Sequence, residues 1–438
     1  MTFSSFLHDL AKKAEGRVLD EPVVRDLGHE LDRHAADHPD GVAGFFARLG
    51  TWAKEHPVTI LNFLRLVRPV LQVKNICIVT SHSGCRHVLG DHEDYAVIYA
   101  DKMKMITEGD NFFLGMDDDE PAGMTARSAM ALVFRREDIG AVVAPAIEAL
   151  AQETIARCGP RFDAVADYLK AVPARFAIKY FGFSAQVDPK WLLETTQTLF
   201  EYLFIDVEND PETAKKATVA AAELRAMLER EIASGGDRSA SDSVLARALK
   251  LSASGHPAFT ARAIRNDFIG LLIGLAPTTA KSAAMAYDLL TQDQEKTERA
   301  ARAAAGAFAD FQALVREATR LNPINPGLFR KARRDTVLLS DGHETKIAKD
   351  TLVFVGTAAG MRDPRHVPDP LSLQPGRPEA AYLTYGHGLH ACFGRYINDL
   401  HIASLLRTLF ASGARRADGA DGDLQFEGPF PHRLSLQR

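Results

Sequence analysis

The chain has 438 residues, of which 46% are hydrophobic and 25% charged, and its formal net charge is −5 at pH 7. This composition excludes a disordered chain, and 57 acidic against 52 basic residues give no positive excess for a nucleic-acid partner. Four cysteines (Cys77, Cys85, Cys158 and Cys392) are too few and too scattered for a disulfide scaffold, which is typical of a cytoplasmic protein.

The N-terminal region is polar and amphipathic over residues 1–20 and holds no apolar core of signal-peptide type. The most apolar early stretch, 58–73, is interrupted by Arg65, Arg68 and Pro69. A membrane-spanning helix needs about 20 mostly apolar residues, so no transmembrane segment is expected. We interpret the stretch as an amphipathic helix rather than a membrane-surface anchor.

Helical periodicity dominates the middle of the chain, where apolar residues recur at three- and four-residue steps. Asp210-Pro211 predicts the start of a long helix because Pro suits the first turn and acids favour the positive end of the dipole. The helices predicted from this pattern cover residues 141–157, 162–181, 188–204, 210–232, 267–290 and 295–321.

The character of the sequence changes after Asn322-Pro323. Residues 328–339 and 351–357 are β-branched and apolar and are predicted to form strands. Pro and Gly crowd residues 363–376, which indicates an ordered loop. One last helix, over about 392–410, precedes a short strand-like tail.

No internal repeat or flexible linker divides the chain, although at about 150 residues per domain its length allows three domains. The pattern therefore predicts a mainly α (α+β) fold, a helix-rich body with small β-sheets. We expect a helical extension over 1–75, packed on one continuous domain over 76–438.

The most informative stretch is Tyr385-Gly386-His387-Gly388-Leu389-His390-Ala391-Cys392-Phe393-Gly394. Glycines let the backbone turn tightly and approach a flat ligand. A thiol at the start of the following helix is stabilised as a thiolate by unpaired amides and the helix dipole, and a thiolate can ligate iron. The alternatives are a buried structural cysteine and a zinc site of His387, His390 and Cys392, which lacks a fourth ligand at a recognised spacing.

This stretch resembles the cysteine-ligand loop of the cytochrome P450 family, whose pattern is Phe-Gly-x-Gly-x-His/Arg-x-Cys-x-Gly. Tyr385 stands in place of the Phe. The resemblance implies the fold of that family, haem b as cofactor, and Cys392 as the axial thiolate ligand of the iron. Gly386 and Gly394 then belong to the haem-binding loop, and His390 falls where the family contacts a haem propionate.

A second motif precedes the loop in the family's order. Glu317-Ala318-Thr319-Arg320 matches Glu-x-x-Arg on a helix, where i and i+3 share a face, although such a pair in isolation is usually a solvated surface pair. Arg377 takes the place of the third member of that ion network. The resemblance implies a buried Arg–Glu–Arg set that holds the loop over the haem.

Two arginines are implied to hold haem propionates. Arg330 begins an Arg-x-Ala-x-x-Asp strand like that of bacterial members, and a guanidinium suits a carboxylate. Arg127 lies in residues 119–134, which resemble the segment that usually carries a His and an Arg for the propionates. Gly123 stands where that His is expected, so one propionate contact is missing.

The long central helix departs from the family at its oxygen side. Where members have Ala-Gly-x-Asp/Glu-Thr-Thr, this chain has Gly274-Leu275-Ala276-Pro277-Thr278-Thr279. Thr278 keeps the alcohol, and Pro277 replaces the acid of the pair that relays protons to bound O2. Pro277 also lacks an N–H and is expected to bend the helix. In the alternative interpretation Pro277 only supplies a kink, and ordered waters with Thr278 or Thr279 carry the protons.

The resemblance implies a haem-thiolate oxidoreductase, a monooxygenase that inserts one oxygen atom into an apolar small molecule. Family members without the acid often use peroxide or rearrange a hydroperoxide, so a peroxygenase or hydroperoxide isomerase without a redox partner is the alternative. Fatty-acid peroxygenases of the family carry a Pro in this turn after an Arg that anchors the substrate, whereas Ala276 precedes Pro277 here. A non-catalytic haem sensor or carrier is the remaining alternative.

A monooxygenase of this kind would take electrons from a separate ferredoxin or flavodoxin, because no flavin or iron–sulfur segment is present. Candidates for a docking patch, each also explained as an ordinary solvated charge, are Lys331, Arg333, Arg334 and Arg395. Candidates for an apolar pocket, each also explained by core packing, are Phe112, Phe113, Leu271 and Ile273.

Overall fold

The computed structural model describes residues 57–110, 112, 121–207 and 209–438, so most of the predicted extension over 1–75 lies outside the described residues, as does Phe113. The chain forms two compact units, each assembled from segments that are distant in the sequence. The sheet unit contains residues 57–96, Asn325–Ser372 and Arg377–Ala391. The helical unit contains Val97–Ile324, Leu373–Gly376 and Cys392–Arg438.

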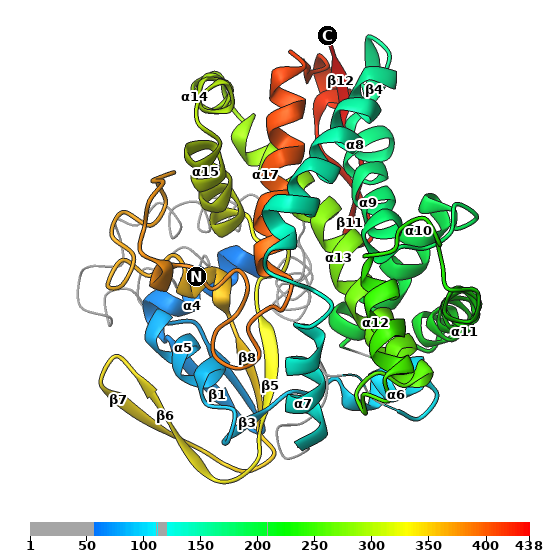
Figure 1. Ribbon diagram of the computed structural model, residues 1–438. Coiled ribbons are helices and arrows are strands. Elements are labelled where there is room, and N and C mark those ends of the chain that lie inside the picture. Colours follow the sequence, from blue (N-terminus) through cyan, green and yellow to red (C-terminus); the bar gives the residue numbers. More distant parts are fainter. Residues whose placement is uncertain (1–56, 111, 113–120, 208) are drawn as a thin grey trace. The chain divides into compact units, whose positions relative to one another are not determined.

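The sheet unit is built on a five-stranded sheet in the order β1-β2-β8-β5-β3, with a separate β6–β7 hairpin (Figure 1). Its elements are α4 (Pro57–Val67), β1 (Val70–Val73), β2 (Ile76–Val79), α5 (His82–Gly90), β3 (Tyr95–Ala96), β5 (Leu328–Ala332), β6 (Thr336–Ser340), β7 (His343–Ile347), β8 (Leu352–Val355), α16 (Thr357–Gly360) and the 3-10 turn Glu379–Ala381. β2 and β8 are parallel and the other neighbours antiparallel. Cys77 and Val79 of β2 and Val353 and Val355 of β8 are fully buried, so alternate residues of these strands form the core of the unit.

The stretch 58–73, predicted as one helix, is in fact a helix followed by a strand. α4 ends at Val67, and β1 begins at Val70. Pro69 explains the change, because proline disfavours the helical conformation of the residue before it and cannot continue the hydrogen-bond ladder. β1 then pairs with β2 across the predicted boundary at position 75, with Val73 opposite Ile76.

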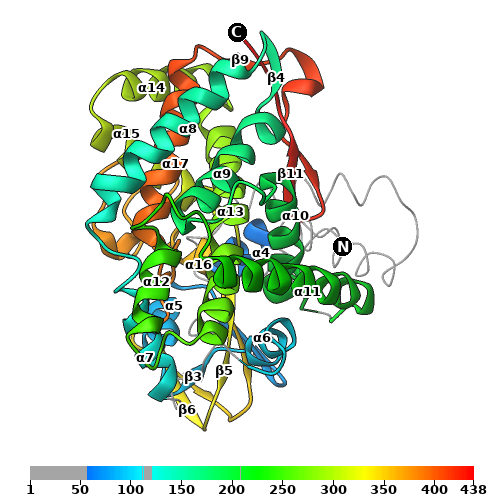
Figure 2. The same cartoon turned by 45° about the vertical axis from the view of Figure 1, so that its right-hand side comes forward.

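The helical unit contains most of the helices and two small sheets, β4-β12-β9 and β10-β11. β4, β9 and β11 lie together at one end of this unit (Figure 2). Its elements are α6 (Ala100–Thr107), α7 (Pro121–Met130), the π-helix Ile139–Val143, α8 (Ala144–Arg157), β4 (Arg161–Asp163), the π-helix Ala164–Leu169, α9 (Ala171–Phe181), α10 (Pro189–Phe200), the π-helix Glu201–Ile205, α11 (Pro211–Ser234), α12 (Val244–Ala253), α13 (Ala261–Leu290), α14 (Gln294–Ala305), α15 (Phe308–Leu321), α17 (Arg395–Ala411), β9 (Arg415–Arg416), the 3-10 turn Gly419–Gly422, β10 (Gln425–Glu427), β11 (Phe430–Arg433) and β12 (Ser435–Gln437).

α13 is the central helix of this unit and packs against α9, α10, α11, α15 and α17. In Figure 1, α8, α9, α13 and α17 lie side by side. The helix begins six residues before its predicted start, because the Thr260 side chain caps it by accepting a hydrogen bond from the Ala263 amide. Most residues of α13 are buried, so contacts with the surrounding helices stabilise it in addition to its periodic apolar pattern.

The predicted helix-rich architecture with small sheets is confirmed, with local differences at helix ends. The predicted helix over 295–321 is two helices, because α14 ends before Gly306. α17 begins at Arg395, three residues later than predicted. Among the described residues, Ile139–Arg157 and Ala261–Leu290 are long and apolar enough to cross a membrane by length and composition, and 72% of the apolar window of the latter is buried in the protein.

Candidate functional site

Cys392 lies two residues before Gly394, the N-cap of α17. Its side chain is exposed, yet burial is the largest influence on its pKa and raises it above the ordinary value of a thiol. A side chain can be both exposed and affected by burial when it is surrounded by many protein atoms but has solvent-accessible space in front of it. The Gly394 amide and the Arg127 guanidinium act in the opposite direction. The amide at the helix start therefore acts in the direction expected for a thiolate, and a metal ion that binds the sulfur would displace its proton.

The loop before Cys392 needs its glycines for its backbone conformation. Gly386 and Gly388 both have φ of +73°, in the left-handed region. A Cβ on Gly388 would also lie 2.6 Å from the carbonyl oxygen of Leu89 and 2.9 Å from the Cα of Gly90, at the end of α5. In the sheet unit, Gly388 thus permits a close approach between two backbone segments rather than an approach to a ligand.

The middle of α13 has one open position, at Gly274. This residue is exposed although Leu272, Ile273 and residues 276–280 are buried, and a Cβ built on it would meet no atom within 4 Å. Thr278, one turn later, directs its hydroxyl to the Gly274 carbonyl oxygen. The opening is a cradle in which a flat group can approach the helix backbone, which fits the haem that the sequence predicts.

Pro277 is buried inside α13, and the helix continues through it without interruption. The expected bend therefore does not break the helix. Pro277 has no N–H to donate to the Ile273 carbonyl, so the turn that carries Thr278 lacks one backbone hydrogen bond. The turn over residues 274–279 contains no Asp or Glu.

Thr279 joins α13 to α17. Its hydroxyl lies 2.7 Å from the Leu275 carbonyl oxygen and 2.7 Å from the side-chain oxygen Oδ1 of Asn398, which both accept from it. The single hydroxyl proton of Thr279 is donated to one of these two oxygens at a time, so both compete for it. Thr279 is thus a tether between the two helices. Sequence reasoning missed Asn398, whose only sequence signal is a polar residue six positions after Cys392.

Glu317 and Arg320 form the predicted buried pair on α15. Both side chains are fully buried, with Nε to Oε1 and Nη2 to Oε2 distances of 2.9 Å. Glu317 Oε2 also accepts a hydrogen bond from the Gln374 amide at 3.0 Å. In the sheet unit, Arg377 donates to the carbonyl oxygens of Pro368 at 2.5 Å and Asp369 at 2.7 Å. The three-membered network that joins Arg377 to this pair stays a prediction.

The predicted propionate contacts lie in both units. In the sheet unit, Arg330 of β5 is buried and donates to the Phe329 carbonyl oxygen at 2.9 Å, while Tyr385 and His390 are half-buried. In the helical unit, the Arg127 guanidinium of α7 lies 5.7 Å from the Phe393 ring centre, next to Cys392 in the chain. Their roles toward a haem stay predictions.

The candidate docking charges differ in their surroundings. In the sheet unit, Lys331 pairs with Asp350 at 2.9 Å and Arg334 with Asp94 at 2.5 Å, so these charges are compensated. In the helical unit, Arg136 and Arg395 both stack on the exposed Tyr396, 4.4 and 4.6 Å from its ring centre. We call Arg136, Arg395 and Tyr396 the Tyr396 patch.

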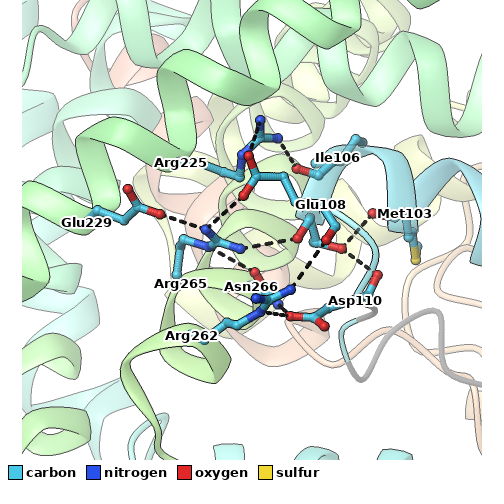
Figure 3. A network of polar contacts seen from close by, with 10 residues as sticks. Met103, Ile106, Glu108, Asp110, Arg225, Glu229, Arg262, Arg265 and Asn266 are labelled. Atoms are coloured by element: carbon cyan, nitrogen blue, oxygen red, sulfur yellow. Dashed lines mark hydrogen bonds and ion pairs between the residues drawn. The ribbon is translucent and has the colours of Figure 1, made fainter.

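A polar network fixes the end of α6 to α11 and α13 (Figure 3). Arg265 of α13 donates to Glu229 at 2.6 Å and to the Thr107 carbonyl oxygen at 3.1 Å, and Asn266 donates to Asp110 at 3.0 Å. Further members are Glu108, Arg225 and Arg262. The network holds the chain just before Phe112, whose buried ring rests on Gly270, where a Cβ would lie 2.1 Å from a ring atom.

A second polar cluster, also missed from the sequence, contains Asp341, Asp363 and His366, whose ligand atoms lie within 4.8 Å of one another. Arg365 bridges the two carboxylates at 2.6 and 2.8 Å and takes the place of a cation. Burial alone would raise the pKa of Asp363, but hydrogen bonds from Arg365 and the His82 amide bring that pKa below its usual value. The cluster therefore ties the β6–β7 turn, which contains Asp341, to the loop that contains Asp363 and His366.

Comparison with known families places one stretch of the chain directly. Residues 309–412, which contain Glu317, Arg320, Arg377 and Cys392, match the cytochrome P450 family model. A bifunctional dioxygenase (DOX)-epoxy alcohol synthase (EAS) from Pyricularia oryzae is 38% identical over 101 residues, which are 23% of this chain and 9% of that protein. The mitochondrial cholesterol side-chain cleavage enzyme of Mus musculus is 33% identical over 142 residues, 28% of this chain and 26% of that enzyme. The chain thus spans under a third of these relatives.

The fold match covers much more of the chain. The ligand-free crystal structure of CYP164A2 from Mycobacterium smegmatis superimposes with a TM-score of 0.72, covering 88% of this chain and 97% of that one at 20% identity. At this identity the likeness establishes the fold alone.

Proposed function

The chain belongs to the cytochrome P450 family by its fold and by the sequence of residues 309–412, and on this premise we propose that it is a haem-thiolate monooxygenase acting on an apolar small molecule. The observation that carries the proposal is the accessible thiol of Cys392 in the same unit as the open face of α13 at Gly274. When bound, the family's haem iron supplies oxygen activation, which a thiolate ligand favours.

The proposal assigns each predicted residue one task toward the cofactor. Cys392 holds the iron, and the Glu317–Arg320 pair stabilises α15. The residues that would hold the haem periphery are Arg127, Arg330, His390, Tyr385, Gly386 and Gly394. Guanidinium and imidazole groups suit propionate carboxylates, and no histidine is present at Gly123 to add a further contact.

Thr278 is the proposed proton donor on α13. Its hydroxyl lies on the face of Gly274, and rotation about χ1 can turn it from the Gly274 carbonyl toward the opening. Thr279 is excluded from this task because its hydroxyl is engaged by Leu275 and Asn398. Pro277 leaves Thr278 without the acid that usually supplies its proton.

The alternative is a peroxide-dependent peroxygenase or a hydroperoxide isomerase. The observation that favours it is Pro277, since a substrate that already carries an O–O bond needs fewer delivered protons and no electron donor. The name of the relative from Pyricularia oryzae, an epoxy alcohol synthase, supports this class. A non-catalytic haem carrier stays the remote alternative.

A monooxygenase requires an electron donor, and we assign the Tyr396 patch to its docking. Two of its members, Arg395 and Tyr396, follow Cys392 by three and four residues, and the patch presents two arginines on an exposed aromatic ring. An acidic ferredoxin or flavodoxin matches this charge. We propose a cytoplasmic location, in which such donors are available.

Two experiments test the assignment. The haem-loaded protein should give the reduced-CO spectrum of a thiolate haem, and Cys392→Ser should lose it, whereas Cys158→Ser, at a half-buried cysteine, should keep it. Product formed with ferredoxin, ferredoxin reductase and O2 supports the monooxygenase. Product formed only with hydrogen peroxide or a lipid hydroperoxide supports the alternative, and no product in either regime supports the carrier.

A further inference from the structure

Lys281 is a buried cation without a counterion. It is the one ionisable residue of α13 between Asp267 and Tyr287, and 7% of it is exposed. Within the part of the chain that the structure describes, its ammonium makes no hydrogen bond or ion pair, and the ring centre of Phe430 lies 5.7 Å away. Other buried cations of the helical unit are paired, as Arg247 is with Asp138 and Arg320 with Glu317.

The position of Lys281 on α13 links it to the open face. Gly274 and Lys281 are seven residues apart, so they point in directions about 20° apart and lie about 10 Å apart along the axis. Each Cα–Cβ bond of a helix tilts toward the N-terminus, so the lysine side chain leaves the helix toward Thr278. The ring nitrogens of His401 are fully buried, whereas Nζ of Lys281 retains some solvent-accessible surface.

The environment of Lys281 disfavours its charge. Burial lowers the pKa of Lys281 to about 8, and no nearby acid acts in the opposite direction. Most molecules therefore carry the charge at neutral pH without compensation. A buried unpaired ammonium is costly, and an anion that enters the site removes that cost.

We propose that Lys281 is the anion-binding end of the substrate site, where it pairs with the carboxylate of an apolar carboxylic acid whose body lies along the Gly274–Thr278 face. The inference rests on the proposed function, because that function puts the substrate on this face. A single ammonium suits a monoanion such as a carboxylate. The Phe430 ring supplies an apolar contact at this end of the molecule.

The test compares an acid with its neutral analogue. Binding of decanoate and of decan-1-ol to the haem-loaded protein is measured by calorimetry for the wild type, Lys281→Met and Lys281→Arg. The wild type should prefer decanoate, and Lys281→Met should weaken decanoate about tenfold or more while changing the alcohol less than about twofold. Lys281→Arg should keep the preference. The matched control is Lys190→Met, on an exposed lysine of α10.

Two results would overturn the inference. Equal weakening of both ligands assigns Lys281 a packing role, and an unchanged decanoate affinity shows that it binds no carboxylate. Unchanged affinity together with slower turnover and more released peroxide would make Lys281 a proton donor instead. The proposed function is tested separately: a wild-type protein without the thiolate-haem spectrum would refute it. Calorimetry measures ligand affinity alone and does not depend on turnover.

Discussion

At the scale of single residues, Thr278 is where the two proposed oxidant regimes can be separated. A monooxygenase needs its hydroxyl to deliver protons, since Pro277 supplies none, whereas a peroxide-driven enzyme needs it less. We expect Thr278→Ala to lower product formed with ferredoxin and O2 by about tenfold or more and to raise released peroxide. Thr278→Ser, which keeps the hydroxyl, should restore most of the product.

The measurement is product and peroxide yield per electron consumed. If Thr278→Ala keeps the full yield with O2, Thr278 is not the proton donor. If it changes peroxide-driven turnover by the same factor, the threonine acts on substrate position rather than on proton delivery.

His401 of α17 predicts how stability depends on pH. Its ring is fully buried against Phe176, and neither ring nitrogen has a partner among the described residues. Burial lowers the pKa of His401 to about 3. Below about pH 6.5 the unfolded chain binds a proton that the folded protein refuses, so stability falls as pH falls through this window.

His401→Leu should remove this component. Compared with the variant, the wild type should lose about 3 kcal/mol more unfolding free energy between pH 7 and pH 4. Urea unfolding at several pH values measures the difference. His343→Gln, on an exposed histidine of β7, is the control, and parallel pH curves for wild type and His401→Leu would contradict the prediction.

At the scale of elements, the cysteine loop depends on a glycine that no other residue can replace. Gly388→Ala combines a left-handed φ with a Cβ that meets the backbone of Leu89 and Gly90. We expect it to destabilise the sheet unit by about 2–4 kcal/mol and to lower haem occupancy. Gly413→Ala has a similar φ of +74° but open space around its Cβ, so it should cost only about 1 kcal/mol.

Thermal unfolding and haem content measure both variants. If the two substitutions lower stability equally, the backbone of Leu89 and Gly90 moves away from the new Cβ without loss of stability. The left-handed φ alone would then explain why position 388 is a glycine.

The glycines of α13 also differ in what surrounds them. Its sequence is apolar along most of its length, and its periodicity predicts a core helix. Gly270 and Gly274 have different reasons for being glycine: the first admits the Phe112 ring, and the second faces open space. Of the two roles predicted for Phe112, lining a pocket or packing in the core, the contact with Gly270 favours packing on α13.

At the scale of the whole molecule, the partner question depends on one exposed patch. Arg136→Glu should slow ferredoxin-driven turnover about tenfold at low salt, because charge steers the association of partners. The difference from wild type should shrink as ionic strength rises. Arg157→Glu, on the exposed end of α8, should have a smaller effect and serves as the control.

Steady-state rates over a series of ferredoxin concentrations give the comparison, with peroxide-driven turnover as the reference. An equal loss in both regimes would show that Arg136 acts on the haem site and not on docking.

The sequence could be interpreted wherever the determinants are local. The glycine-rich loop that ends in Cys392 and the Glu317-x-x-Arg320 motif predicted the family, and Asp210-Pro211 predicted the start of α11, whose N-cap is Asp210. These features depend on residues within one or two turns of each other. Strand pairing and helix ends were less predictable, as the split of 58–73 into α4 and β1 shows.

By itself the sequence predicted the family, its cofactor and the replacement of an acid by Pro277, because motif spacing records covalent neighbours and short-range backbone geometry. Tertiary structure decided that Thr279 is tied to Asn398, that Gly388 faces the backbone of α5, and that Lys281 is buried without a counterion. Each of these is a contact, or the lack of one, between segments far apart in the chain. Burial and pairing set the energy of a polar group, and neither is encoded in its immediate neighbours.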